Sequence, residues 1–145
     1  MTKDLYNLKH ALHNEQVCQH LLTGIKCDDW IIITAFYSAL KFASHKIFPF
    51  KVPSIDGKTT SIESIDQYMR YDNHKDKSKH QLLVELVEKH CVEIAESYSK
   101  LLDMSMSARY KAYHHDPAIS AQARTLLQKI KKSCATNAEI ESCTI

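Results

Sequence analysis

The hydrophobic positions of this chain recur at helical spacing over most of its length. The first such segment runs from about Lys3 to Thr23 and stops at Gly24, a residue that favours the position just after a helix. Its apolar residues fall on one side of the predicted helix: Leu5, Leu8, Leu12, Val17, Leu21 and Leu22. The pattern therefore predicts an amphipathic helix that packs against the rest of the chain.

The second segment begins after Asp28 or Asp29, either of which could cap a helix, and must end before Pro49. It is apolar nearly all round from Trp30 to Ala43, a pattern typical of a helix buried on every side. We therefore expect it to be the central helix, with the following side chains in the core: Trp30, Phe36, Tyr37, Leu40 and Phe42.

Residues 49–60 interrupt the helical pattern. They include Pro49, Pro53 and Gly57 and are predicted to form a loop. A short helix is then expected to start at Ser61 or Ser64, with an apolar side that carries Ile62, Ile65, Tyr68 and Met69. The stretch from residue 72 to residue 79 is polar and charged, which predicts exposure to solvent.

A long apolar stripe resumes near Ser78 and holds Leu82, Leu83, Leu86, Val87, Ile94, Tyr98, Leu101 and Leu102. Whether it forms one helix or two before Tyr113 stays open. The helix must end by His115, because a residue that precedes proline avoids the α region. Asp116 and Pro117 then form a cap and first-turn pair for a last helix that extends to Lys132.

These elements predict an all-α fold, an up-and-down bundle of four to five helices in a single domain over residues 1–132. Residues 133–145 are polar and carry no stripe, so they are expected to be a flexible tail. With 44% hydrophobic and 25% charged residues, the chain is typical of a globular domain. Its net charge of +2 neither requires nor excludes a nucleic-acid partner.

The sequence also indicates a cellular location. The polar, charged first residues lack the apolar core of a signal peptide, and the run from Trp30 to Leu40 is too short to cross a bilayer. The 5 cysteines include no Cys-x-x-Cys pair and are interpreted as reduced thiols. The expectation is a cytoplasmic protein without membrane association.

The main candidate chemistry lies where the long stripe ends. Arg109 precedes His114 and His115 just before the last predicted helix. An arginine that binds a phosphate and a histidine that moves a proton suffice for metal-free RNA cleavage. On an ideal helix a spacing of five residues means about 500° of rotation, which leaves the side chains roughly 140° apart. They converge only if the helix unwinds near Tyr113 or a second subunit supplies one of them.

The chain resembles the HEPN family, whose hallmark is an arginine, four to six residues, and a histidine near the end of a small helical bundle. Arg109 and His114 fit with four intervening residues, and His115 fits with five. Asp29 and Trp30 followed by the run from Phe36 to Leu40 resemble the second helix of one group of these proteins. In that group the arginine stands in a Ser-Ala-Arg-Tyr run, here residues 107–110.

The resemblance implies a homodimer in which two copies of the motif face each other, and cleavage of RNA without metal or other cofactor. His114 would be the general acid or base, with His115 as the alternative, and Arg109 would stabilise the charged phosphorane. Tyr110 and Tyr113 could stack on unpaired bases beside Lys111. The resemblance further implies a role in toxin–antitoxin or antiviral defence, with RNA and an antitoxin or other protein as partners.

Two departures from the family pattern keep an alternative open. Tyr110 follows the arginine where many catalytic members carry Asn or Asp, and Asp116 occupies a position where toxins paired with nucleotidyltransferases often carry tyrosine. The alternative is a non-catalytic dimeric scaffold or regulatory subunit that binds a partner protein or nucleic acid. In a purely structural interpretation, Arg109 pairs with a carboxylate such as Asp103 or Asp116.

The histidines outside the motif suggest a third hypothesis, a helical bundle that binds a metal ion through histidines. His10, His13 and His20 fall near one face of the first helix with Cys18 close by, but no short-spaced partner completes a four-ligand zinc site. His74, His80 and His90 stand among lysines and glutamates and are predicted to lie on the solvated surface.

Overall fold

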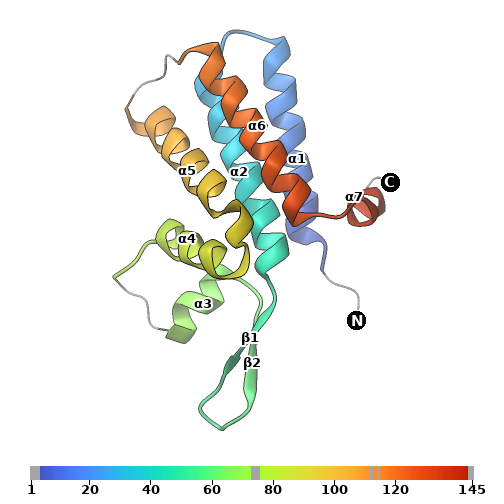
Figure 1. Ribbon diagram of the computed structural model, residues 1–145, viewed down its shortest axis with the longest axis vertical. Coiled ribbons are helices and arrows are strands. Elements are labelled where there is room, and N and C mark those ends of the chain that lie inside the picture. Colours follow the sequence, from blue (N-terminus) through green and yellow to red (C-terminus); the bar gives the residue numbers. More distant parts are fainter. Residues whose placement is uncertain (1–3, 73–75, 112, 114, 144–145) are drawn as a thin grey trace.

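The computed structural model describes residues 4–72, 76–111, 113 and 115–143. Four long helices form its body: α1 (Tyr6–His20), α2 (Asp28–Ile47), α5 (Ala95–Tyr110) and α6 (Pro117–Cys134). They alternate in direction along the chain (Figure 1). The described residues are mostly helical and include one small sheet of two strands, which confirms the predicted all-α class.

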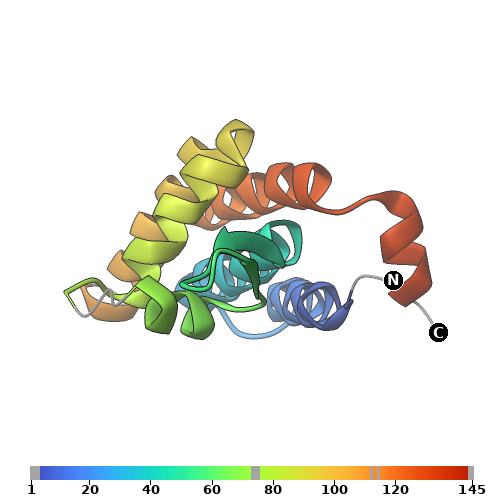
Figure 2. The same ribbon diagram turned by 90° about the horizontal axis from the view of Figure 1, so that it is seen from below.

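Helix α2 is the centre of the bundle, as the sequence predicts. It lies between α1 on one side and α5 and α6 on the other (Figure 2). Phe36 and Phe42 are fully buried, whereas Tyr37 and Leu40 are partly buried against the core. The expectation for Trp30 is wrong, because its side chain is 56% exposed in the first turn. A helix that is apolar all round does not show which side faces solvent at its ends.

The expected helix ends are partly correct. Helix α1 continues into a 3₁₀ turn, η1 (Leu21–Thr23), and stops at Gly24, whose φ of −108° is not the left-handed cap conformation. Neither aspartate caps α2, because Cys27 precedes the helix and Asp28 lies in its first turn. There Asp28 accepts a hydrogen bond of 2.7 Å from the hydroxyl of Ser120, which joins the N-terminal turns of α2 and α6.

The expected loop after α2 is a β-hairpin. Strands β1 (Phe50–Pro53) and β2 (Thr59–Ile62) pair antiparallel, with Phe50 opposite Ile62 and Pro53 opposite Thr59. Gly57 supplies the positive φ, 79°, that the turn requires. Ile62 is fully buried and attaches the hairpin to the core. Proline and glycine mark the ends and the turn of these short strands, which hides them in the sequence.

Two helices share the long stripe. After the short helix α3 (Ile65–Asp72), helix α4 (Lys79–His90) begins with a capping box between Ser78 and Gln81. Helix α4 ends at Cys91 (φ −138°, ψ 52°), and the chain passes through a 3₁₀ turn, η2 (Val92–Ile94), into α5. The stripe is therefore divided once, which settles the alternative that the sequence left open.

The last elements are both helical. Asp116 caps α6 by accepting a 2.8 Å hydrogen bond from the backbone N–H of Ala118, as predicted. In the segment predicted as a flexible tail, residues 137–143 form a short helix, α7 (Asn137–Cys143). Glu139 of α7 lies 2.8 Å from Nε2 of His45, and Ile140 packs against the core. A helix of this length is too short to show a periodic stripe.

Among the described residues, none of the helices is both long enough and apolar enough to span a membrane.

Candidate functional site

Arg109 lies in the last turn of α5 and is held in place by α2. Its Nη1 donates a 2.8 Å hydrogen bond to the hydroxyl of Tyr37, and its Nη2 donates to the sulfur of Met106 at 3.0 Å. The guanidinium also lies over the ring of Tyr37 at 5.4 Å and the ring of Tyr110 at 5.3 Å. Two aromatic rings and two acceptors therefore fix the half-buried side chain.

The charge of Arg109 is not balanced by a carboxylate of the described part of the chain. No ion pair forms with Asp103, Asp116 or any other described acidic residue, so the purely structural pairing is wrong for these partners. The Nε atom is buried and has no hydrogen-bond partner among the described residues. A guanidinium has five N–H donors, and those left over can bind an anion such as a phosphate.

His80 lies in the first turn of α4 and faces this same region. Its ring lies 5.6 Å from the ring of Phe36, and its Nδ1 is buried without a described partner. Burial, followed by the positive charge of Arg109, lowers the pKa of His80 below its usual 6.5. The predicted solvated position is therefore wrong, because His80 is half-buried and close enough to Arg109 to be affected by its charge.

The sequence does contain a signal for His80. Its distance from Leu83 and Val87 along the chain is three and seven residues, the spacing of one helix face. Both leucine and valine are buried, so the histidine continues the apolar stripe of α4. The charged neighbours Lys77 and Lys79 concealed this pattern.

Two further polar side chains lie on the face of α5 that carries Arg109. Tyr98 and Ser105 precede Arg109 by eleven and four residues, which places all three on one stripe. Both side chains are fully buried, and their hydroxyls have no partner among the described residues. Burial raises the pKa of Tyr98. Buried polar groups of this kind are uncommon in folded proteins.

Phe36 connects these groups. Its ring lies 5.5 Å from Tyr37 and 5.8 Å from Tyr98, in addition to His80. We call the following set the Arg109 cluster: Tyr37, His80 and Tyr98 on the ring of Phe36, Arg109 on the hydroxyl of Tyr37, and Ser105 on the stripe of α5 between Tyr98 and Arg109. Three helices, α2, α4 and α5, contribute to it, so residues distant in the sequence meet at one site.

The other predicted site residues are placed as follows. Tyr110 and Tyr113 are 72% and 70% exposed, which excludes them from the core of the chain. Lys111 is exposed and His115 is half-buried just before the cap of α6. The helix does unwind after Tyr110, as convergence of the motif requires. His114 lies outside the described residues.

Exposed apolar side chains surround the same end of the bundle. Helices α2 and α6 start here, side by side, and α5 ends here (Figure 1). We call this surface the apolar end; it consists of Leu22, Ile25, Trp30, Met106, Tyr110, Tyr113 and Ile119. Its residues come from η1, α2, α5, α6 and the connections between them, which all reach this end of the bundle.

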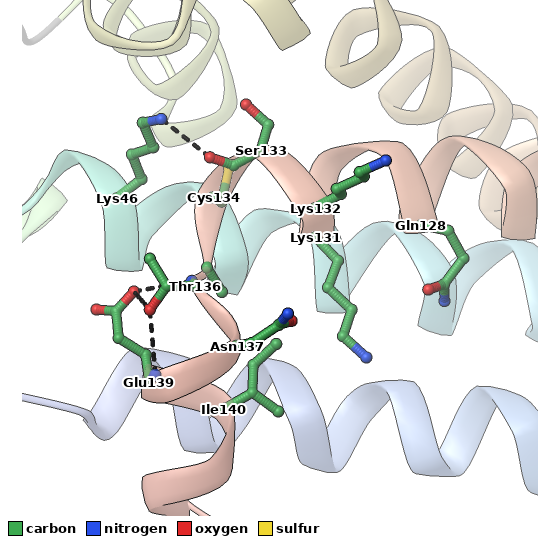
Figure 3. A pocket seen from close by; sticks show the side chains of 11 residues that line it. Lys46, Gln128, Lys131, Lys132, Ser133, Cys134, Thr136, Asn137, Glu139 and Ile140 are labelled. Carbon is green, nitrogen blue, oxygen red and sulfur yellow. Dashed lines mark hydrogen bonds between the residues drawn. The ribbon is translucent and has the colours of Figure 1, made fainter.

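A groove of about 820 Å³ lies away from Arg109, between the C-terminal end of α6 and helix α7 (Figure 3). Lys46 on its wall donates to the carbonyl of Ser133 at 2.9 Å and to Glu93 at 3.2 Å. Lys131 contacts Glu15 at 2.8 Å. Because two of the three lysines in this groove already have acceptors, it is a poorer anion site than Arg109.

The described residues contain no group of three or more His, Cys, Asp or Glu side chains that could hold a metal ion. Cys18 is buried and donates to the carbonyl of Ile31 at 3.5 Å, so it does not join the histidines of α1. No protein-family model matches the chain, and searches of curated proteins and of solved structures find no significant match. The HEPN resemblance therefore rests on the motifs alone.

Proposed function

We propose that this protein is a HEPN-like, metal-independent endoribonuclease in which Arg109 binds the phosphate that is attacked. The observation that carries the proposal is the state of Arg109: half-buried, fixed by Tyr37 and Met106, and unpaired with any described carboxylate. An arginine held in this way is preorganised for an anionic transition state, because it does not first have to break an ion pair.

The surroundings of Arg109 support single-stranded RNA as the substrate. Tyr110 and Tyr113 are exposed on either side of Lys111. Aromatic side chains stack on unpaired bases, and a lysine attracts the backbone. An RNA strand bound over the end of α5 would then place a phosphate at Arg109.

The proposed reaction needs only groups of the protein and the RNA. The ribose 2′-oxygen forms a bond to phosphorus while the bond from phosphorus to the 5′-oxygen breaks. Arg109 stabilises the negative charge that develops on the phosphorane, and His114 exchanges protons with the reacting oxygens. The products are a 2′,3′-cyclic phosphate and a free 5′-hydroxyl.

The first test is cleavage of end-labelled single-stranded RNA in the presence of EDTA. We expect fragments with 2′,3′-cyclic phosphate ends, and no cleavage of a 2′-O-methyl RNA of the same sequence, because its 2′-oxygen has no proton to lose and is blocked as a nucleophile. No cleavage of the 2′-O-methyl RNA should be detectable. Cleavage of the unmodified and the 2′-O-methyl RNA at similar rates, or cleavage of neither RNA, would contradict the proposal.

The apolar end supports a second part of the proposal, a homodimer in which another copy of the chain covers the part of this surface around Trp30 and leaves Tyr110 and Tyr113 open to RNA. The two Arg109 clusters would then lie near the interface, as the family resemblance implies. Toxin–antitoxin or antiviral defence is the biological setting that the same resemblance implies. If the protein is a dimer and cleaves no RNA, the scaffold hypothesis is favoured instead.

Trp30 provides the test of this interface. Because it is a large, exposed aromatic side chain at the apolar end, Trp30→Ala should raise the dimer dissociation constant by about 30-fold. The stability of the monomer should change by no more than about 0.5 kcal/mol. Sedimentation of wild type, Trp30→Ala and Val92→Ala checks this, since Val92 is exposed on the distant turn η2. An unchanged dissociation constant for Trp30→Ala would remove this surface from the interface.

A further inference from the structure

We propose that His80 is a further catalytic residue of this site, the base that accepts the proton of the attacking 2′-hydroxyl. This inference rests on the proposed ribonuclease function and names the group that accepts the first proton in the reaction. It gives the reaction a second histidine, on a different helix from the Arg–His motif.

His80 is connected to Arg109 through two aromatic side chains of α2. Phe36 contacts both His80, at 5.6 Å, and Tyr37, at 5.5 Å, and the Tyr37 hydroxyl is the acceptor that holds Arg109. The positive charge of Arg109 lowers the pKa of His80. Two ring contacts of Phe36 and one hydrogen bond of Tyr37 therefore connect the imidazole to the guanidinium. On this path we infer that a phosphate bound by Arg109 brings its neighbouring ribose toward His80.

The surroundings of the His80 imidazole favour its neutral form. Burial and the neighbouring guanidinium both lower the pKa of His80, so the ring is neutral near pH 7. A neutral imidazole is the form that accepts a proton. Nδ1 is buried, and Nε2 has no hydrogen bond with a described residue. Nε2 is therefore the atom we assign to proton transfer.

Within the described part of the chain, the packing of His80 leaves one of its ring nitrogens unsatisfied. Its buried Nδ1 has no partner within the described chain, and an apolar side chain on the same stripe would avoid the cost of an unsatisfied polar atom. The hydroxyls of Tyr98 and Ser105 are in the same situation on α5. A buried polar group without a partner calls for an explanation, and a catalytic role is one such explanation.

The step balances without any further reactant. As the 2′-oxygen bonds to phosphorus, its proton passes to Nε2 of His80. The departing 5′-oxygen takes a proton from the motif histidine, which we propose to be His114. Exchange with solvent then returns both histidines to their starting states.

The experiment uses the full chain and compares His80→Ala with His90→Ala. His90 is a matched control, because it is also half-buried on α4, its pKa is also lowered by burial, and it packs on Phe50 at 4.7 Å rather than near Arg109. We expect His80→Ala to slow single-turnover cleavage by about 10²–10⁴-fold. His90→Ala should cleave at nearly the wild-type rate.

Two additional measurements separate catalysis from folding. Binding of 2′-O-methyl RNA should be unchanged in His80→Ala, and free imidazole should restore its cleavage by about tenfold or more, because the base can be replaced from solution. Imidazole should not restore Arg109→Ala. A His80→Asn variant, similar in shape but unable to act as a base at neutral pH, should remain slow.

Each outcome decides a different claim. If wild type cleaves RNA and both His80→Ala and His80→Asn cleave it at the wild-type rate, the role of His80 is overturned while the ribonuclease proposal stands. A slow variant that also loses binding, and that imidazole does not rescue, would likewise overturn it and leave a structural role. If wild type does not cleave RNA, the proposed function and this inference both fail.

Discussion

Replacing Arg109 by alanine is expected to slow RNA cleavage by about 10²–10³-fold, the usual effect of removing one group that stabilises a developing negative charge. The guanidinium is held by Tyr37 on the buried helix α2, so the substitution removes a donor that is fixed in position. Single-turnover cleavage of end-labelled RNA measures the effect. Because Arg109 makes one hydrogen bond to another helix within the described part of the chain, stability should fall by about 1 kcal/mol.

Two variants make this result specific. Arg70 is exposed on α3, so Arg70→Ala removes the same charge away from the site and should leave cleavage unchanged. Arg109→Lys keeps the charge but loses the planar set of donors, and should recover only part of the rate. Equal rates for wild type and Arg109→Ala would remove Arg109 from the mechanism.

Phe36→Ala is expected to have the largest effect on stability, a loss of about 3–5 kcal/mol in the free energy of unfolding. Phe36 has no exposed surface, and its ring contacts Tyr37, His80 and Tyr98. Its removal leaves a cavity where three helices meet. Urea unfolding followed by circular dichroism measures the loss.

Ile55→Ala is the control for this variant, because Ile55 is fully exposed in the hairpin turn. It should change stability by less than about 0.5 kcal/mol. If Phe36→Ala costs no more than Ile55→Ala, then Phe36 does not support the Arg109 cluster. A large loss would also predict weaker RNA binding at temperatures where Phe36→Ala remains folded, since Tyr37 would no longer be fixed.

The sequence predicts those features of the fold that depend on local chemistry. Ser78 and Asp116 are found at helix starts because their side chains satisfy backbone N–H groups that no helix residue can reach. The β-hairpin is missed because its strands are short and are interrupted by the residues that normally indicate a loop. Trp30 is misplaced because periodicity fails in a helix that is apolar on all sides.

Only those parts of the candidate site that are continuous in the sequence can be predicted from it. Arg109 can be identified because its motif is continuous in the sequence. Tyr37 contacts Arg109, and His80 comes near it through Phe36, only because of tertiary packing, and no spacing in the chain indicates this arrangement. The apolar stripe of α4 shows that His80 faces inward, but only the fold shows what it faces.

The central position of α2 has a consequence for hydrogen exchange. Its amide hydrogens are covered by neighbours on several sides, so they should exchange only when the whole bundle unfolds. The hairpin and α3 have fewer neighbours and should exchange through local opening events of lower free energy. Tyr37, which holds Arg109, belongs to the helix that should exchange most slowly, so we expect these local openings to leave the arginine in place.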